Sequence, residues 1–178
     1  MTMPGAACYQ PFYCEENIWQ FVDGVSAARW AHLRVIFITN ETRTVALANQ
    51  RAGQDGLVVW DYHVVALELD PGALIIDFDC ISGSPLDAET WMRQTFGPLA
   101  HVSPQYQPTF MVYPADVYHR DFRSDRRHML DEQGRWSQPP PSWQPIGHGH
   151  NLETWMSGSH ASAKRMSKER LSTYWVPS

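Results

Sequence analysis

The sequence predicts a single domain of the mixed α/β (α+β) class with a largely antiparallel sheet. The chain has 178 residues, of which 43 % are hydrophobic and 19 % charged, a balance that suits one domain with a sizeable core. Apolar strand-like runs are interspersed with stretches of helical periodicity. Two of these runs, 57–69 and 73–80, are joined by the tight turn "DPG". They are therefore expected to pair as an antiparallel hairpin.

The first half of the chain is expected to hold one helix followed by strands. Apolar residues recur at helical spacing over 15–25, and Glu15 and Glu16 suit the positive end of a helix dipole. Cys14 is therefore expected at or just before a helix N-terminus. The strands that follow are predicted at 34–40, 44–49, 57–69 and 73–80.

The second half of the chain alternates helices with one strand and a long loop. A helix is predicted over 85–97, with Asp87 as its cap and Gly97 just past its end. A strand at 109–113 precedes a short helix opened by Pro114. The later segments are expected to be an ordered irregular loop at 124–149, a helical turn at 151–156 and an atypical, poorly patterned tail at 157–178.

Composition excludes several classes of partner. The net charge of −5 and the absence of a basic patch argue against nucleic acid. No run approaches the roughly 18 apolar residues that span a bilayer, and the N-terminus lacks the pattern of a signal peptide. The three cysteines, Cys8, Cys14 and Cys80, are expected to be reduced thiols of a cytosolic protein.

Three residue types along the chain fit nucleophilic catalysis. Cys14 at a helix start would feel the dipole and the free N–H groups, which favour thiolate. His63 lies inside the apolar run 57–69, and the predicted hairpin brings Asp77 across from it or diagonal to it. Asp79 shares that strand face and is the competing candidate. A Cys–His–Asp constellation is thus predicted, in which the carboxylate orients the imidazole.

Several blocks of the sequence resemble those of the protein N-terminal glutamine amidohydrolase family. "YCEENIW" (13–19) and "WDYHVV" (60–65) are similar to its two signature blocks. The segments "DFD" (77–79), "SDRRHM" (124–129), "PPP" (139–141) and "NLETWM" (151–156) follow in the family's order. The resemblance covers roughly 8–156, whereas the family's strand and closing helix are not evident in 157–178.

The resemblance implies a function and a fold. The family converts the N-terminal glutamine of proteins to glutamate, releases ammonia and feeds the N-degron pathway. The resemblance implies an α-β-α sandwich that is similar to the transglutaminase and papain-like core. It also implies the triad Cys14, His63 and Asp77. It also implies a monomer of the cytoplasm, and of the nucleus as well, that needs neither cofactor nor metal.

The residues that bind the substrate are less well indicated. A carboxylate is the natural partner of the substrate's α-ammonium group, and Glu15, Asp61 and Asp79 are candidates. Tyr13 and Trp60 are candidates for the walls of the pocket.

Three alternatives stay open. The same triad would serve a papain-like peptidase or a transglutaminase, and the altered C-terminus would suit an inactive protein that only binds N-terminal glutamine. His148 and His150 in "GHGH", with His160, form a weak candidate zinc site.

Overall fold

Strand β1 (Leu33–Thr39) lies at the centre of the computed structural model, which describes residues 9–175. Its side chains alternate between two hydrophobic clusters: Val35 and Phe37 join one, and Ile36 and Ile38 join the other. β-Branched and aromatic residues suit such a pleated surface. A strand that is apolar on both faces requires a covering layer on each side.

The main sheet contains six strands in the order β6-β5-β4-β1-β7-β8, and every pairing within it is antiparallel. Besides β1, its strands are β4 (His63–Glu68), β5 (Leu74–Ile76), β6 (Leu86–Asp87), β7 (Thr109–Pro114) and β8 (Lys164–Met166). A separate two-stranded sheet pairs β2 (Val45–Leu47) with β3 (Val58–Trp60).

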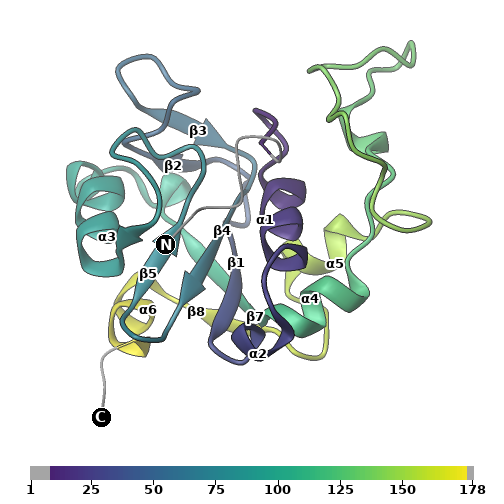
Figure 1. Cartoon of the computed structure of the whole chain (residues 1–178). Coiled ribbons are helices and arrows are strands. Elements are labelled where there is room, and N and C mark those ends of the chain that lie inside the picture. The colour runs from purple at the N-terminus through teal and green to yellow at the C-terminus, as the bar shows by residue number, and fades with distance from the viewer. Residues whose placement is uncertain (1–8, 176–178) are drawn as a thin grey trace.

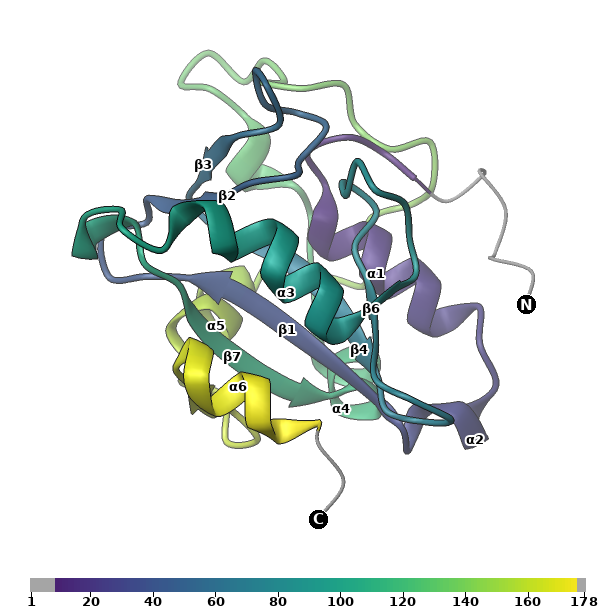
Figure 2. The same cartoon turned by 90° about the vertical axis from the view of Figure 1, so that its left-hand side faces the viewer.

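Helices cover both faces of the main sheet (Figures 1 and 2). On one face lie α1 (Cys14–Asp23), α4 (Ala115–Asp121) and α5 (Leu152–Ser157), with the short α2 (Ala27–Trp30) beside them. The other face is covered by α3 (Ala88–Phe96), α6 (Lys168–Tyr174) and the small sheet. The predicted α-β-α sandwich is therefore confirmed, while the likeness to a transglutaminase or papain-like core stays a prediction.

The predicted strand over 57–69 is wrong in one respect, because it is two strands. β3 belongs to the small sheet and β4 to the main sheet, and the chain bends between them at Asp61 and Tyr62. The Asp61 carboxylate accepts the Tyr62 backbone N–H at 3.0 Å, and the Asp61 backbone carbonyl accepts the Thr39 hydroxyl at 2.8 Å. These bonds satisfy backbone groups at the bend. The chain can therefore turn within a run of residues that reads as one continuous strand.

The predicted caps of α3 and the predicted start of α4 agree with the structure. The Asp87 carboxylate accepts the Thr90 backbone N–H at 2.9 Å, which satisfies one of the free donors at the start of α3. The helix ends at Phe96, with Gly97 as its C-cap. Pro114 is the N-cap of α4, close to its predicted place. Among residues 9–175 the chain also forms three 3-10 turns: η2 (Gly97–Leu99), η3 (Pro104–Tyr106) and η4 (Arg127–Met129).

The tail that the sequence analysis set apart contains regular secondary structure between residues 164 and 174. β8 pairs with β7, and Leu171 of α6 is fully buried. The Ser167 hydroxyl caps α6 by accepting the Arg170 backbone N–H. The tail thus contains a strand and a closing helix that the sequence pattern did not reveal. None of the helices described has the length and apolar character that crossing a bilayer requires.

Candidate active site

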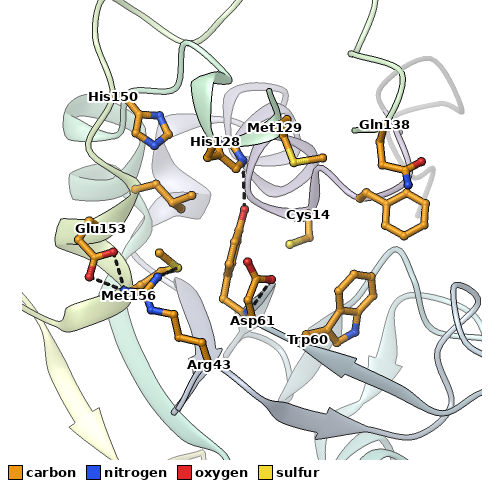
Figure 3. Close-up of a pocket in the computed structure, with 13 residues that line it drawn as sticks. Cys14, Arg43, Trp60, Asp61, His128, Met129, Gln138, His150, Glu153 and Met156 are labelled. Carbon is orange, nitrogen blue, oxygen red and sulfur yellow. Dashed lines mark hydrogen bonds and ion pairs between the residues drawn. The ribbon is translucent and has the colours of Figure 1, made fainter. Parts of the chain in front are cut away.

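Cys14 is the first residue of α1 and lines a pocket of about 320 Å³ (Figure 3). Its side chain is almost buried, at 7 % exposure. The helix begins here because Tyr13 has a non-helical backbone conformation, while the residues after it bury Ile18 and Val22 against the sheet. The first N–H groups of a helix have no partners within it. The thiol therefore lies at the positive end of the helix and contributes to the wall of the pocket.

His63 is the first residue of β4 and is completely buried. Its Nε2 lies 2.9 Å from Asp77 Oδ1. Its Nδ1 has no hydrogen-bond partner among the residues the structure describes. The indole of Trp60 stacks on the imidazole, with 5.6 Å between ring centroids and 16° between planes. The ring is thus held at Nε2 and on one face, whereas Nδ1 has no hydrogen bond to the described residues.

Asp77 is the most heavily bonded carboxylate of the site. Oδ1 accepts from His63 and from the Asp79 backbone N–H at 3.1 Å. Oδ2 accepts from Gln50 Nε2 and Trp91 Nε1, both at 3.0 Å. Four donors from four parts of the chain thus satisfy this fully buried carboxylate. Without such partners, burying its charge in an apolar layer would be very costly.

The same residues form the one cluster with metal-binding spacing among residues 9–175. Donor atoms of His63, Asp77 and Asp79 lie within 4.8 Å of one another. Both Asp77 oxygens already accept two hydrogen bonds each, and Asp79 Oδ1 accepts the Tyr9 hydroxyl at 2.6 Å. The donor set therefore has the chemistry of an orienting network and not of a metal site.

The electrostatics of the couple favour a charged imidazole. Burial by itself lowers the pKa of His63, but the charge and hydrogen bond of Asp77 outweigh it, so the net shift is upward. Burial would raise the pKa of Asp77, but the pairing with His63 and the bonds from its other donors lower it below its usual value. Both shifts favour the imidazolium–carboxylate form of this pair.

The electrostatics of the thiol oppose its ionisation. Burial raises the pKa of Cys14 well above the usual value, and the charges of Glu15 and Asp79 add to the shift. The backbone N–H of Val64 acts in the opposite direction. Because Val64 follows His63 directly in β4, this donor places the sulfur beside the strand that carries the imidazole. A thiolate here requires positive charge close by.

The structure separates the sequence-predicted substrate residues into two groups. Trp60 and Asp61 line the pocket. Tyr13, Glu15 and Asp79 are buried and do not line it. The Tyr13 hydroxyl donates to the Gln138 carbonyl at 3.2 Å, and burial raises the pKa of this phenol to about 12. Tyr13 therefore supports the pocket wall from behind.

Much of the pocket wall comes from parts of the chain that sequence reasoning did not select. These residues are Arg43, His128, Gln138, His150, Glu153 and Met156. Within residues 9–175, His148, His150 and His160 form no cluster with metal-binding spacing, and His150 instead stacks on His128 at 5.1 Å between centroids. The available signal was that His128 lies within "SDRRHM" and that His150 directly precedes "NLETWM".

The long loop that carries these histidines is anchored by a buried ion pair. Arg126 donates from Nε and Nη2 to the two carboxylate oxygens of Glu16, at 2.9 and 2.8 Å. Trp143 Nε1 donates to the same carboxylate at 2.8 Å. Because Glu16 is on α1, two residues after Cys14, this anchor holds the loop above the nucleophile.

Comparisons with known proteins agree with this geometry. A model of the N-terminal glutamine amidase family matches residues 9–173, which include most of the segment first set apart as a tail. The protein N-terminal glutamine amidohydrolase of Drosophila virilis is 38 % identical over 151 residues, covering 81 % of this chain and 74 % of the relative. That of Drosophila willistoni is 39 % identical over 145 residues, covering 78 % and 71 %.

Proposed function

This chain belongs to the N-terminal glutamine amidase family, and from that premise we propose that it deamidates the N-terminal glutamine of polypeptides to glutamate and releases ammonia. It is an enzyme that hydrolyses an amide C–N bond. The observation that best supports a triad of Cys14, His63 and Asp77 is the arrangement of the imidazole. Asp77 holds Nε2, and Nδ1 is free to exchange a proton with a thiol.

The reaction proceeds in two steps. The Cys14 thiolate attacks the side-chain carboxamide carbon of the glutamine, while His63 holds the thiol proton as imidazolium. The tetrahedral intermediate collapses, the imidazolium gives its proton to the leaving nitrogen, and ammonia departs from a thioester. Water, deprotonated by His63, then attacks the thioester and regenerates the thiol with glutamate as product. The unpaired backbone N–H of Cys14 is the candidate donor to the oxyanion.

Recognition of the free α-ammonium group falls to Asp61 in this proposal. Two acidic side chains line the pocket, Asp61 and Glu153. Both oxygens of Glu153 are occupied by Arg43, at 2.5 and 2.6 Å. Asp61 is exposed, and its carboxylate accepts only the Tyr62 backbone N–H from the described residues. A substrate ammonium would supply the missing charge-assisted bonds.

The same family membership supports three broader expectations. The product, an N-terminal glutamate, would feed the arginylation branch of the N-degron pathway. The enzyme would then meet its substrates in the cytoplasm and nucleus. It would act as a monomer, without cofactor or metal.

The test is mass spectrometry of a short glutamine-initiated peptide incubated with the protein, with released ammonia assayed in parallel. We expect conversion of the free N-terminal glutamine, no conversion of an N-acetylated or asparagine-initiated peptide, and complete loss in Cys14→Ser. Cys80→Ser is the matched control, because Cys80 is a buried thiol of the other core cluster. Cleavage of a peptide bond would instead point to a peptidase. Binding without turnover by the folded protein would point to an inactive binder.

A further inference from the structure

The two consecutive acids of α1 are both fully buried but have different partners. Glu16 is neutralised by Arg126, whose charge is permanent. Of the described residues, only His128 brings a basic side chain within ion-pair distance of Glu15, with Nε2 3.3 Å from Oε1. One carboxylate thus has a permanently charged partner, and the other has a histidine.

Glu15 also contacts the nucleophile. Its second oxygen, Oε2, lies 3.7 Å from the Cys14 sulfur. The carboxylate therefore bridges the thiol and the His128 ring, which itself lines the pocket beside Cys14. A bare carboxylate at this distance would oppose thiolate strongly, since like charges are weakly screened away from water. Glu15 does not line the pocket, so direct contact with substrate does not account for its position.

His128 has two further contacts besides Glu15. Its Nε2 lies 3.4 Å from the Tyr62 hydroxyl, and its ring stacks on His150 at an angle of 27°. Burial first, and then the neighbouring His128, lower the pKa of His150, which disfavours the charged form of that ring. The other ionisable groups that act on the thiol or on His150 are Asp79, Asp61, Asp125 and Arg127.

We propose that His128 is a positioning residue, which as an imidazolium offsets the Glu15 charge beside Cys14 and so allows the thiolate to form at neutral pH. The site then has two histidine–carboxylate couples on the nucleophile. His63, held by Asp77, exchanges the proton with the thiol, and Glu15 and His128 set the charge. This inference deepens the proposed function and concerns the same thiol, but it can be tested without any substrate.

The experiment measures the rate at which iodoacetamide alkylates Cys14 between pH 5 and 10. Peptide mapping counts each cysteine separately, and circular dichroism confirms that each variant is folded. We expect His128→Asn to slow Cys14 alkylation at pH 7 by about tenfold and to move its pH profile upward. Glu15→Gln should move the profile downward. His101→Asn, at an exposed position remote in sequence from the site, is the matched control and should change nothing.

The double variant His128→Asn/Glu15→Gln decides how His128 acts. If His128 works through Glu15, removing the carboxylate rescues alkylation to within about threefold of Glu15→Gln alone. A double variant as slow as His128→Asn, or single variants without effect on the pH profile, would overturn the proposal. Glu15→Gln tests it independently if His128→Asn does not fold. Absence of glutamine deamidation by a wild type with this alkylation pattern would refute the proposed function and leave the inference standing.

Discussion

At the scale of single residues, the choice between Asp77 and Asp79 shows how the hairpin positions the imidazole. The β4–β5 register pairs Ala66 with Ile76, so a longer hairpin would bring Asp79 directly opposite His63. β5 instead ends at Ile76 and the chain turns. The diagonal residue, Asp77, therefore reaches Nε2, and Asp79 contributes its backbone N–H to the same carboxylate. The hairpin predicted from the sequence allowed either residue to pair with His63. The end of β5 at Ile76 selects Asp77.

Replacing Asp77 by Asn should lower kcat by about 10³–10⁴-fold, because the amide stabilises the wrong tautomer and no longer supports an imidazolium. The Asp77 charge raises the pKa of His63, so its removal lowers that pKa. The acid limb of the kcat/KM profile should therefore move to lower pH. Asp116→Asn, at an exposed residue of α4, is the control. An acid limb that did not move would argue against His63 as the base.

Asp61→Asn should reduce kcat/KM for a glutamine-initiated peptide by about 10–100-fold, the loss typical of a charge-assisted hydrogen bond. The effect should appear mainly in KM, because the residue holds the α-ammonium group and not the reacting amide. Steady-state kinetics would measure it, with Asp55→Asn at an exposed site as the control. Unchanged kinetics in Asp61→Asn would assign amine recognition elsewhere.

At the scale of elements, the loop between α4 and α5 is anchored by a buried ion pair. Between Ser124 and Ile146, which pair as an isolated bridge, the chain contains only the short turn η4 as a helix. Arg126 adopts a left-handed backbone conformation, with φ of 66°, and points its guanidinium at Glu16. An irregular segment is held by few contacts, so the loss of one buried pair matters more here than in the sheet.

Arg126→Ala should lower the free energy of unfolding by about 3–5 kcal/mol, since it leaves a buried carboxylate without a partner. The neighbouring Arg127 pairs with Asp125 on the surface, where its side chain is 66 % exposed. Arg127→Ala is therefore the matched control and should cost no more than about 1 kcal/mol. Urea denaturation of both variants provides the comparison, and equal losses would contradict the anchor.

At the scale of the whole molecule, the C-terminal segment completes one of the two covering layers. β8 pairs with β7, which would otherwise be an open edge of the sheet, and Met166 and Leu171 join the cluster that contains β2 and α3. The tail thus helps to cover the sheet. Its polar composition concealed this role, because among residues 157–175 only Met166 and Leu171 are deeply buried.

Leu171→Ala should destabilise the protein by about 2–5 kcal/mol, the usual cost of a cavity at a fully buried leucine. Thr173→Ala, two residues later on the exposed side of α6, should change stability by less than about 0.5 kcal/mol. Chemical denaturation followed by circular dichroism measures both. A Leu171→Ala variant as stable as the wild type would mean that α6 is dispensable for the core.

What the sequence by itself determined is the local structure and the chemistry that depends on it. Helical periodicity and two consecutive acids, Glu15 and Glu16, predicted the helix that begins at Cys14. Cap residues predicted the ends of α3. The two signature blocks indicated the family that the comparisons confirmed. These features depend on neighbouring residues, whose spacing and hydrogen bonding are readable along the chain.

Only the tertiary structure decided which distant residues share the site. Glu16 and Arg126 are 110 residues apart in sequence, and their pairing brings His128 above Cys14. The corner at Asp61 and the four donors on Asp77 likewise involve separate segments. A buried charge must find a partner wherever the fold provides one, and no local pattern records where that partner lies in the sequence.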